Sequence, residues 1–187
     1  MTQTVELSTG PRTTSRSGAV GALVVAGAVV VLAHVPFRSL EALLGAGLGG
    51  LASPSVGDVE ISGPTFILWA GTHDARPYYV HAACTVVPFV AAALLVAATM
   101  LVAARELAPA LVVRRALLVV VGLLAANTLR IAGIVVAVGL LGPDDGYWVG
   151  HRLVGTLLML LAVGAGLWFL LRPLFRPAVR PVVREVR

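Results

Sequence analysis

The sequence predicts an all-α polytopic membrane protein with four transmembrane helices. Of its 187 residues, 58% belong to the hydrophobic set and only 12% are charged, and the mean hydropathy is +0.95. In an ordinary soluble domain the apolar residues, glycine included, make up only about 45–50%. Here the apolar residues also gather in long runs between short segments that contain arginine. This composition excludes soluble, disordered and collagenous classes, and the single cysteine excludes an intrachain disulfide.

The first apolar run follows a polar segment. Residues 1–17 are rich in threonine and serine, and we expect them to form a disordered cytoplasmic tail. Residues 18–35 are almost wholly apolar and can cross a bilayer core of about 30 Å that thins a little. A cleaved signal peptide is the alternative, but its apolar region normally has only about 7–15 residues. A retained span is therefore the better interpretation.

The next two segments are not ordinary spans. Leucines alternate with glycines over residues 39–52, whose length is typical of a re-entrant or interfacial segment; whether they cross the membrane stays open. Residues 58–69 predict a short extracytoplasmic hairpin, because polar and apolar side chains alternate up to a Ser-Gly-Pro turn. Three aromatic residues nearby suit the headgroup level as anchors: Trp69, Tyr78 and Tyr79.

Three more apolar runs predict the remaining spans, over residues 84–104, 116–141 and 151–171. Pro88 falls in the first turn of its helix if Thr85 is the cap, and there its missing N–H costs nothing. The run over 116–141 would be roughly 39 Å long, so this helix must tilt or project from the bilayer.

The distribution of arginine predicts the orientation. All 14 basic residues are arginine, and ten of them lie in the first tail, in the connection over 105–115 and in residues 172–187. The opposite loops hold three, so the positive-inside rule places the ten in the cytoplasm. Residues 172–187 would be a basic cytoplasmic tail, and residues 18–171 a single domain in the cytoplasmic membrane. The net charge of +5 therefore indicates membrane topology rather than a nucleic-acid partner.

This topology brings three polar residues from three spans to one depth near the external face. Cys84 opens the second span and His151 opens the fourth, while Arg130 lies inside the third, about 21 Å from its cytoplasmic end. A charged side chain inside a span costs about 2.5–3.5 kcal/mol on insertion scales, so it usually faces the bundle interior and pairs with another group. Asn127, three positions earlier, shares the helical face of Arg130.

Together these side chains are suited to covalent catalysis. Each alone has a plainer interpretation, such as a structural arginine or a small buried cysteine. A thiol beside a guanidinium at a helix N-terminus, however, is where a thiolate is stabilised. A thiolate can attack a carbonyl, a histidine can move the proton, and an arginine can hold the oxyanion. Haem ligation by His81 and His151 is a minor alternative; we expect no metal and no cofactor.

Three short motifs lie in order on the last three predicted spans. They are Ala83-Cys84-Thr85, Asn127-Thr128-Leu129-Arg130-Ile131, and His151 followed by Gly155. Over about residues 56–171 the sequence resembles the exosortase/archaeosortase family of membrane-embedded cysteine transpeptidases, whose members carry Cys, Arg and His in this order. Two features depart from the family pattern. Val86 stands where the family often has glycine, and some relatives use arginine in place of the histidine, so Arg152 is also a candidate to face the thiol.

The resemblance implies a cysteine protease or transpeptidase at the outer face of the membrane. Cys84 would be the nucleophile, His151 the general acid/base and Arg130 the oxyanion-stabilising group, with Asn127 orienting Arg130. The implied partner is a substrate protein whose C-terminal sorting signal comprises a short motif, a transmembrane helix and a basic tail. Cleavage between motif and helix would pass the acyl group to an acceptor. The alternative is a non-enzymatic membrane scaffold or transporter subunit in which Arg130 is structural.

Overall fold

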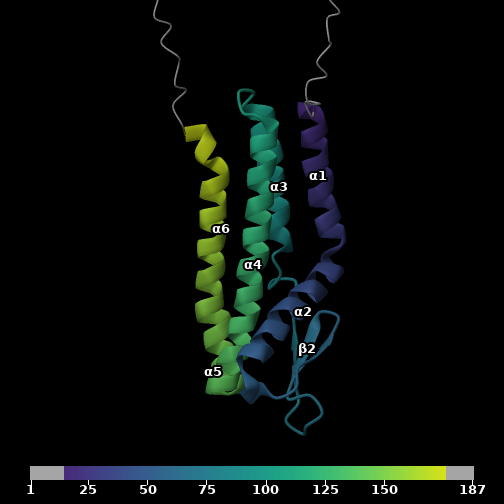
Figure 1. The fold of residues 1–187 in the computed structure, drawn as a ribbon, viewed down its shortest axis with the longest axis vertical. Helices are drawn as coiled ribbons and strands as arrows, with labels where there is room; N and C mark the ends of the chain where they lie inside the picture. Colours follow the sequence, from purple (N-terminus) through teal and green to yellow (C-terminus); the bar gives the residue numbers. More distant parts are fainter. Residues whose placement is uncertain (1–14, 176–187) are drawn as a thin grey trace, which may run out of the picture.

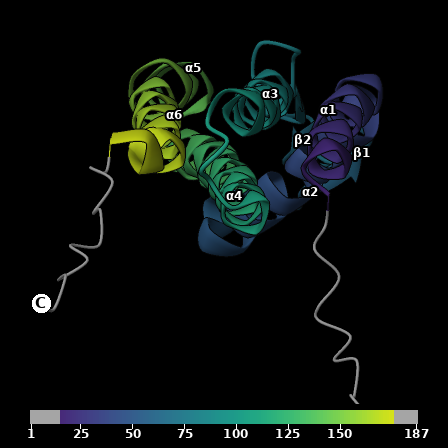
Figure 2. The same ribbon diagram turned by 90° about the horizontal axis from the view of Figure 1, so that it is seen from above.

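The computed structural model describes residues 15–175 as a helical bundle with a small sheet at one end (Figure 1). Helices make up 76% of the structure, so the predicted helical class is confirmed. The main helices are α1 (Arg16–Leu32), α2 (His34–Ala52), α3 (Val87–Ala103), α4 (Pro109–Leu141) and α6 (Gly155–Leu171). In the view along the bundle (Figure 2), α4 packs against α2, α3 and α6, whereas α1 packs against α3.

Two helices are long and apolar enough to cross a membrane. One is α4, and the other is the continuous helix over Pro143–Phe175. The latter joins α5 (Pro143–Tyr147), the π-helical η2 (Trp148–Val154), α6 and the short turn η3 (Arg172–Phe175). The pair α1 and α2 would be a third span if it counts as one span broken by a bend of 74°. With 17 residues, α3 is apolar but at the lower limit of about 17–25 residues for a span.

The bend between α1 and α2 differs from the prediction of one span over residues 18–35. Helix α1 ends at Leu32, and α2 begins at His34 and includes Pro36. A proline ring clashes with the carbonyl four residues earlier and offers no N–H to it. For Pro36 that carbonyl belongs to Leu32, which explains why the first helix ends there.

Residues 39–52 are the greater part of α2, and their leucine-glycine pattern has a packing role. A Cβ atom on Gly45 would lie 2.5 Å from Cβ of Ile131, and one on Gly49 would lie 2.6 Å from Cβ of Val135. Such distances leave no space for a side chain, so these two glycines let the backbone of α2 approach α4 closely. The leucines of the segment point away from this interface and are exposed: Leu40, Leu43, Leu44, Leu48 and Leu51.

The predicted hairpin supplies two strands of a three-stranded antiparallel sheet. Strands β1 (Glu60–Ser62) and β2 (Thr65–Leu68) pair with Ile61 opposite Phe66, and β3 (Arg76–Tyr79) adds to β2 with Tyr78 opposite Phe66. The third strand was missed because Pro77 argues against a strand. A proline is tolerated here since β3 is an edge strand. Phe66 and Leu68 point inward and are buried against α2 and α4.

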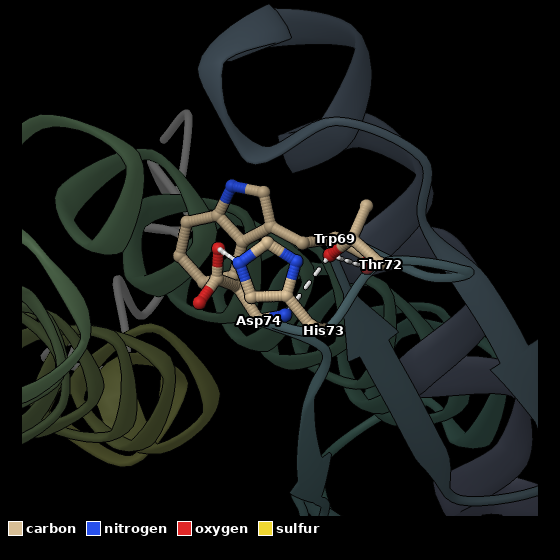
Figure 3. A network of polar contacts seen from close by, with 4 residues as sticks. All are labelled: Trp69, Thr72, His73 and Asp74. Carbon is tan, nitrogen blue, oxygen red and sulfur yellow. Dashed lines mark hydrogen bonds and ion pairs between the residues drawn. The ribbon is translucent and has the colours of Figure 1, made fainter.

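The loop between β2 and β3 is closed by its own polar groups (Figure 3). The Thr72 hydroxyl donates to the carbonyl of Trp69 at 2.8 Å and accepts from the backbone N–H of Asp74 at 3.2 Å. His73 and Asp74 form an ion pair of 3.3 Å whose side chains are 93% and 73% exposed. An exposed pair of this kind contributes little to stability. The loop therefore owes its shape mainly to the Thr72 turn.

The opposite end of the bundle is tied together by Arg16. Its guanidinium donates to the carbonyls of Ala104 at 3.1 Å, Arg105 at 2.6 Å and Leu107 at 2.7 Å. The start of α1 therefore lies at the same end of the bundle as the α3–α4 connection. Figure 1 shows that α6 also ends there, and that the sheet and α5 lie at the opposite end. Of the two predicted tails, residues 1–14 and 176–187 lie outside the described residues.

Candidate active site

The structure brings the side chains of Cys84, Arg130 and His151 into contact. His151 Nε2 lies 3.1 Å from Cys84 Sγ and 3.2 Å from Nη2 of Arg130. In the tautomer that carries its proton on Nδ1, Nε2 has one lone pair, and both the thiol and the guanidinium N–H lie within hydrogen-bond distance of it. The three groups come from the β3–α3 turn, from α4 and from η2. The proximity predicted from span depth is observed, and the catalytic roles stay predictions.

Cys84 lies in a turn rather than in the helix that it was predicted to open. Its backbone N–H donates to the carbonyl of His81 at 2.8 Å, and α3 begins only at Val87, with Val86 as its N-cap. Pro88 is the physical reason, because in a longer helix its ring would clash with the carbonyl of Cys84. Thr85 is therefore not the cap, although its hydroxyl accepts from the Val87 N–H at 3.3 Å. Cys84 as a whole is half-buried.

Arg130 reaches the histidine across a glycine of the last helix. A Cβ atom on Gly155 would lie 2.9 Å from both Cγ and Nε of Arg130, and 2.7 Å from the carbonyl oxygen of Gly150. The missing side chain at this position therefore makes the space through which the arginine passes.

Asn127 does not hold Arg130 in the way the sequence predicted. The residue is fully buried, and neither polar atom of its side chain has a hydrogen-bond partner among the described residues. Its amide instead lies close enough to interact with the carboxylate of Glu41 on α2. Asn127 and Arg130 share a helical face and lie near the same carboxylate, that of Glu41. The Asn127 side chain makes no hydrogen bond to Arg130.

His151, and not Arg152, faces the thiol. His151 sits within the π-helical turn η2, while Arg152 is exposed and lines a separate cleft. A π-helical turn inside an α-helix is rare and frequently occurs at functional sites. Close packing holds this turn in place, since a Cβ atom on Gly150 would lie 2.9 Å from Cα of Ile134.

A column of stacked rings connects the sheet to the imidazole. Phe66 stacks on Tyr78 with centroids 5.4 Å apart, Tyr78 contacts Tyr147 at 5.7 Å, and Tyr147 stacks on His151 at 5.0 Å and 16°. Stacked aromatic pairs contribute roughly 0.5–1.5 kcal/mol beyond burial. Burial raises the pKa of the Tyr78 hydroxyl above its ordinary value. The sheet thus orients the histidine, a role that we had not predicted for Tyr78.

Sequence reasoning missed Tyr147, although it stands four residues before His151 and so shares its helical face. It also missed Glu41, whose carboxylate is 1% exposed. No spacing in the sequence relates Glu41 to the site residues, because only the tertiary packing of α2 against α4 brings this segment to the site.

The site lies between a polar cleft and an apolar groove. A small cavity of about 30 Å³ is lined by Cys84, Arg130 and His151 together with the ring column. A cleft of about 560 Å³ shares its tyrosines and is bordered by Arg76, Asp144 and Arg152. On the other side, a groove of about 270 Å³ starts at Ala83 and Arg130 and runs between α3 and α6. Its other walls are mostly apolar: Phe89, Thr156, Met159, Leu160 and Val163.

The other histidines offer no metal centre. The His81 ring makes an edge contact with Tyr79 at 6.2 Å, and Nε2 of His151 is engaged by Cys84 and Arg130. Over residues 15–175, no group of three His, Cys, Asp or Glu side chains could hold a metal ion. The site is thus an arrangement of a thiol, an imidazole and a guanidinium.

Comparison of the chain with protein-family models, with curated proteins and with solved structures finds no match. What the fold and the site define is a helical protein with two helices long and apolar enough to cross a membrane and a Cys-His-Arg cluster at one end of the bundle.

Proposed function

We propose that the protein is a membrane-embedded cysteine protease or transpeptidase, similar in chemistry to the exosortase/archaeosortase family. The observation that carries this proposal is the contact of one imidazole nitrogen with both the thiol and the guanidinium, at 3.1 and 3.2 Å. A nucleophile within hydrogen-bond reach of a base is the mark of covalent catalysis. A packing cysteine needs neither neighbour.

The reaction runs in two steps. Cys84 Sγ passes its proton to His151 Nε2 and attacks the scissile carbonyl carbon, whose oxygen becomes an anion beside the Arg130 guanidinium. The C–N bond breaks, the leaving amine takes the proton from His151, and a thioester on Cys84 remains. An acceptor nucleophile then attacks the thioester and gives its proton to His151. The C–S bond breaks and the leaving thiolate takes this proton from His151, which regenerates the thiol.

The membrane arrangement that we propose has four spans, formed by the α1–α2 pair, α3, α4 and the helix over Pro143–Phe175. The end of the bundle that carries Arg16 and the α3–α4 connection would face the cytoplasm, by the positive-inside rule. The sheet and the catalytic cluster would then face outward, where exported proteins are processed.

The surroundings of the thiol suit a substrate with a polar motif followed by a transmembrane helix. The motif would lie in the cleft beside β3, whose outer edge is unpaired among the described residues and can accept an extended segment as an added strand. The helix would follow the apolar groove between α3 and α6. Cys84 lines the small cavity that shares its tyrosines with the cleft and Arg130 with the groove, so it would lie near the point where such a substrate is cut.

The proposal is tested by processing of a tailed substrate. The full chain is expressed with a protein from the same genome that ends in a motif, an apolar helix and a basic tail. Cys84→Ala should abolish processing while the protein accumulates normally. Arg130→Ala and His151→Ala should lower the rate by about 100-fold or more, as expected for an oxyanion donor or a general base. Arg105→Ala, at an exposed arginine of the α3–α4 connection at the other end of the bundle, is the matched control and should retain most activity. Full activity in Cys84→Ala would contradict the proposal.

A further inference from the structure

The buried acid Glu41 lies behind the catalytic cluster and takes no part in the mechanism above. It is 1% exposed on the face of α2 that packs against α4. Acidic side chains are almost never buried to this degree unless they are paired or hydrogen-bonded. Its partners therefore indicate why it is there.

One oxygen of Glu41 caps the helix that follows the nucleophile. Oε1 accepts a hydrogen bond of 2.9 Å from the backbone N–H of Val86, 45 residues away in the chain. Val86 is the N-cap residue of α3, and its own side chain makes no capping bond. The first N–H groups of a helix have no partner inside it. Glu41, which belongs to another helix, supplies the acceptor for the Val86 N–H.

The Glu41 carboxylate also lies near other polar groups of the site. Oε2 has no hydrogen-bond partner among the described residues, nor have the amide of Asn127 and Nε of Arg130. Thr85, Asn127 and Arg130 all lie close enough to interact with the Glu41 carboxylate. These residues belong to the same two segments that carry the thiol and the guanidinium.

We infer that Glu41 is a positioning residue for the nucleophile: by bonding the Val86 N–H it fixes the turn that holds Cys84 within reach of His151. Glu41 contacts neither the substrate nor the reacting atoms. It acts through the backbone of Val86, which is two residues after Cys84 in the chain. The inference rests on the proposed function, which makes Cys84 the nucleophile. Its consequence, however, is a change in the reactivity of the Cys84 thiol, which can be measured without a substrate.

The reactivity of Cys84 with iodoacetamide tests this inference without any substrate. The chain has one cysteine, so alkylation of the purified full chain, followed by intact mass at about pH 7, reports this thiol alone. An ordinary thiol is only a few per cent thiolate at this pH. Glu41→Met removes the acceptor at similar volume and should slow alkylation at least tenfold. Glu41→Gln keeps an oxygen acceptor for the Val86 N–H and should react within about twofold of wild type. Glu60→Gln, an exposed acid on β1, is the control.

The outcomes separate positioning from the other roles. Alkylation of folded Glu41→Met at the wild-type rate would overturn the inference. A tenfold loss in Glu41→Gln would overturn it as well, because charge and not the hydrogen bond would then be decisive. This second variant keeps the test sharp if Glu41→Met does not accumulate. Failure of the proposed function would appear differently, as absent processing with the order of alkylation rates unchanged.

Discussion

At the scale of single residues, prolines and glycines decide where the reactive groups can lie. Pro88 keeps Cys84 out of α3, and the missing side chain of Gly155 gives Arg130 its path to His151. Both residues can be found in the sequence, and the shared depth of Cys84, Arg130 and His151 was predicted from the order and direction of the spans. Glu41 could not be predicted, because its role depends on a hydrogen bond that spans 45 residues of the chain.

Gly155→Ala tests the path of Arg130. Alanine is favoured over glycine by about 1 kcal/mol inside a helix, but here the added methyl would lie 2.9 Å from the arginine and 2.7 Å from the carbonyl oxygen of Gly150. We expect processing to fall at least tenfold, about 1.4 kcal/mol in the barrier. The same helix offers a control in Gly164→Ala, where a Cβ meets nothing within 4 Å. Equal activity of the two variants would show that the path is not needed.

At the scale of elements, α2 shows what the hydropathy pattern could and could not predict. The length of residues 39–52 indicated an element unlike an ordinary span, and the structure shows a helix bent by 74° from α1. Its glycines were visible, but their partner on α4 was not, since nothing local specifies which helix a small-residue face will meet. For the same reason, the ring column from Phe66 to His151 went unpredicted.

Gly49→Ala tests the close contact of α2 with α4. The added Cβ would lie 2.6 Å from Cβ of Val135, and overpacking of this kind typically costs about 1–3 kcal/mol. Gly47→Ala, where a Cβ meets nothing within 4 Å, should be neutral or slightly stabilising. Thermal unfolding of the purified variants in detergent measures the difference. The contact would be unimportant if both variants melted together.

At the scale of the whole molecule, composition predicted the helical class, and the structure contains two helices of full spanning length. Arg16 bonds the α3–α4 connection directly, so these two arginine-containing segments lie at the same end of the bundle. Span lengths were predicted less well, because a hydropathy pattern does not reveal where proline ends a helix. The proposed function requires that a reactive thiol faces the exterior at the sheet end of the bundle.

Labelling of Cys84 in intact cells tests this statement most directly. The probe is a small, charged, membrane-impermeant thiol reagent, used at mildly acidic pH, where an unassisted thiol is almost wholly protonated. The reference is Cys84→Ala/His73→Cys, whose single thiol stands at a position with a side chain 93% exposed. Wild type should react without permeabilisation and faster than the reference, and His151→Ala should remove this advantage. Reaction only after permeabilisation, or a rate that does not depend on His151, would contradict the account.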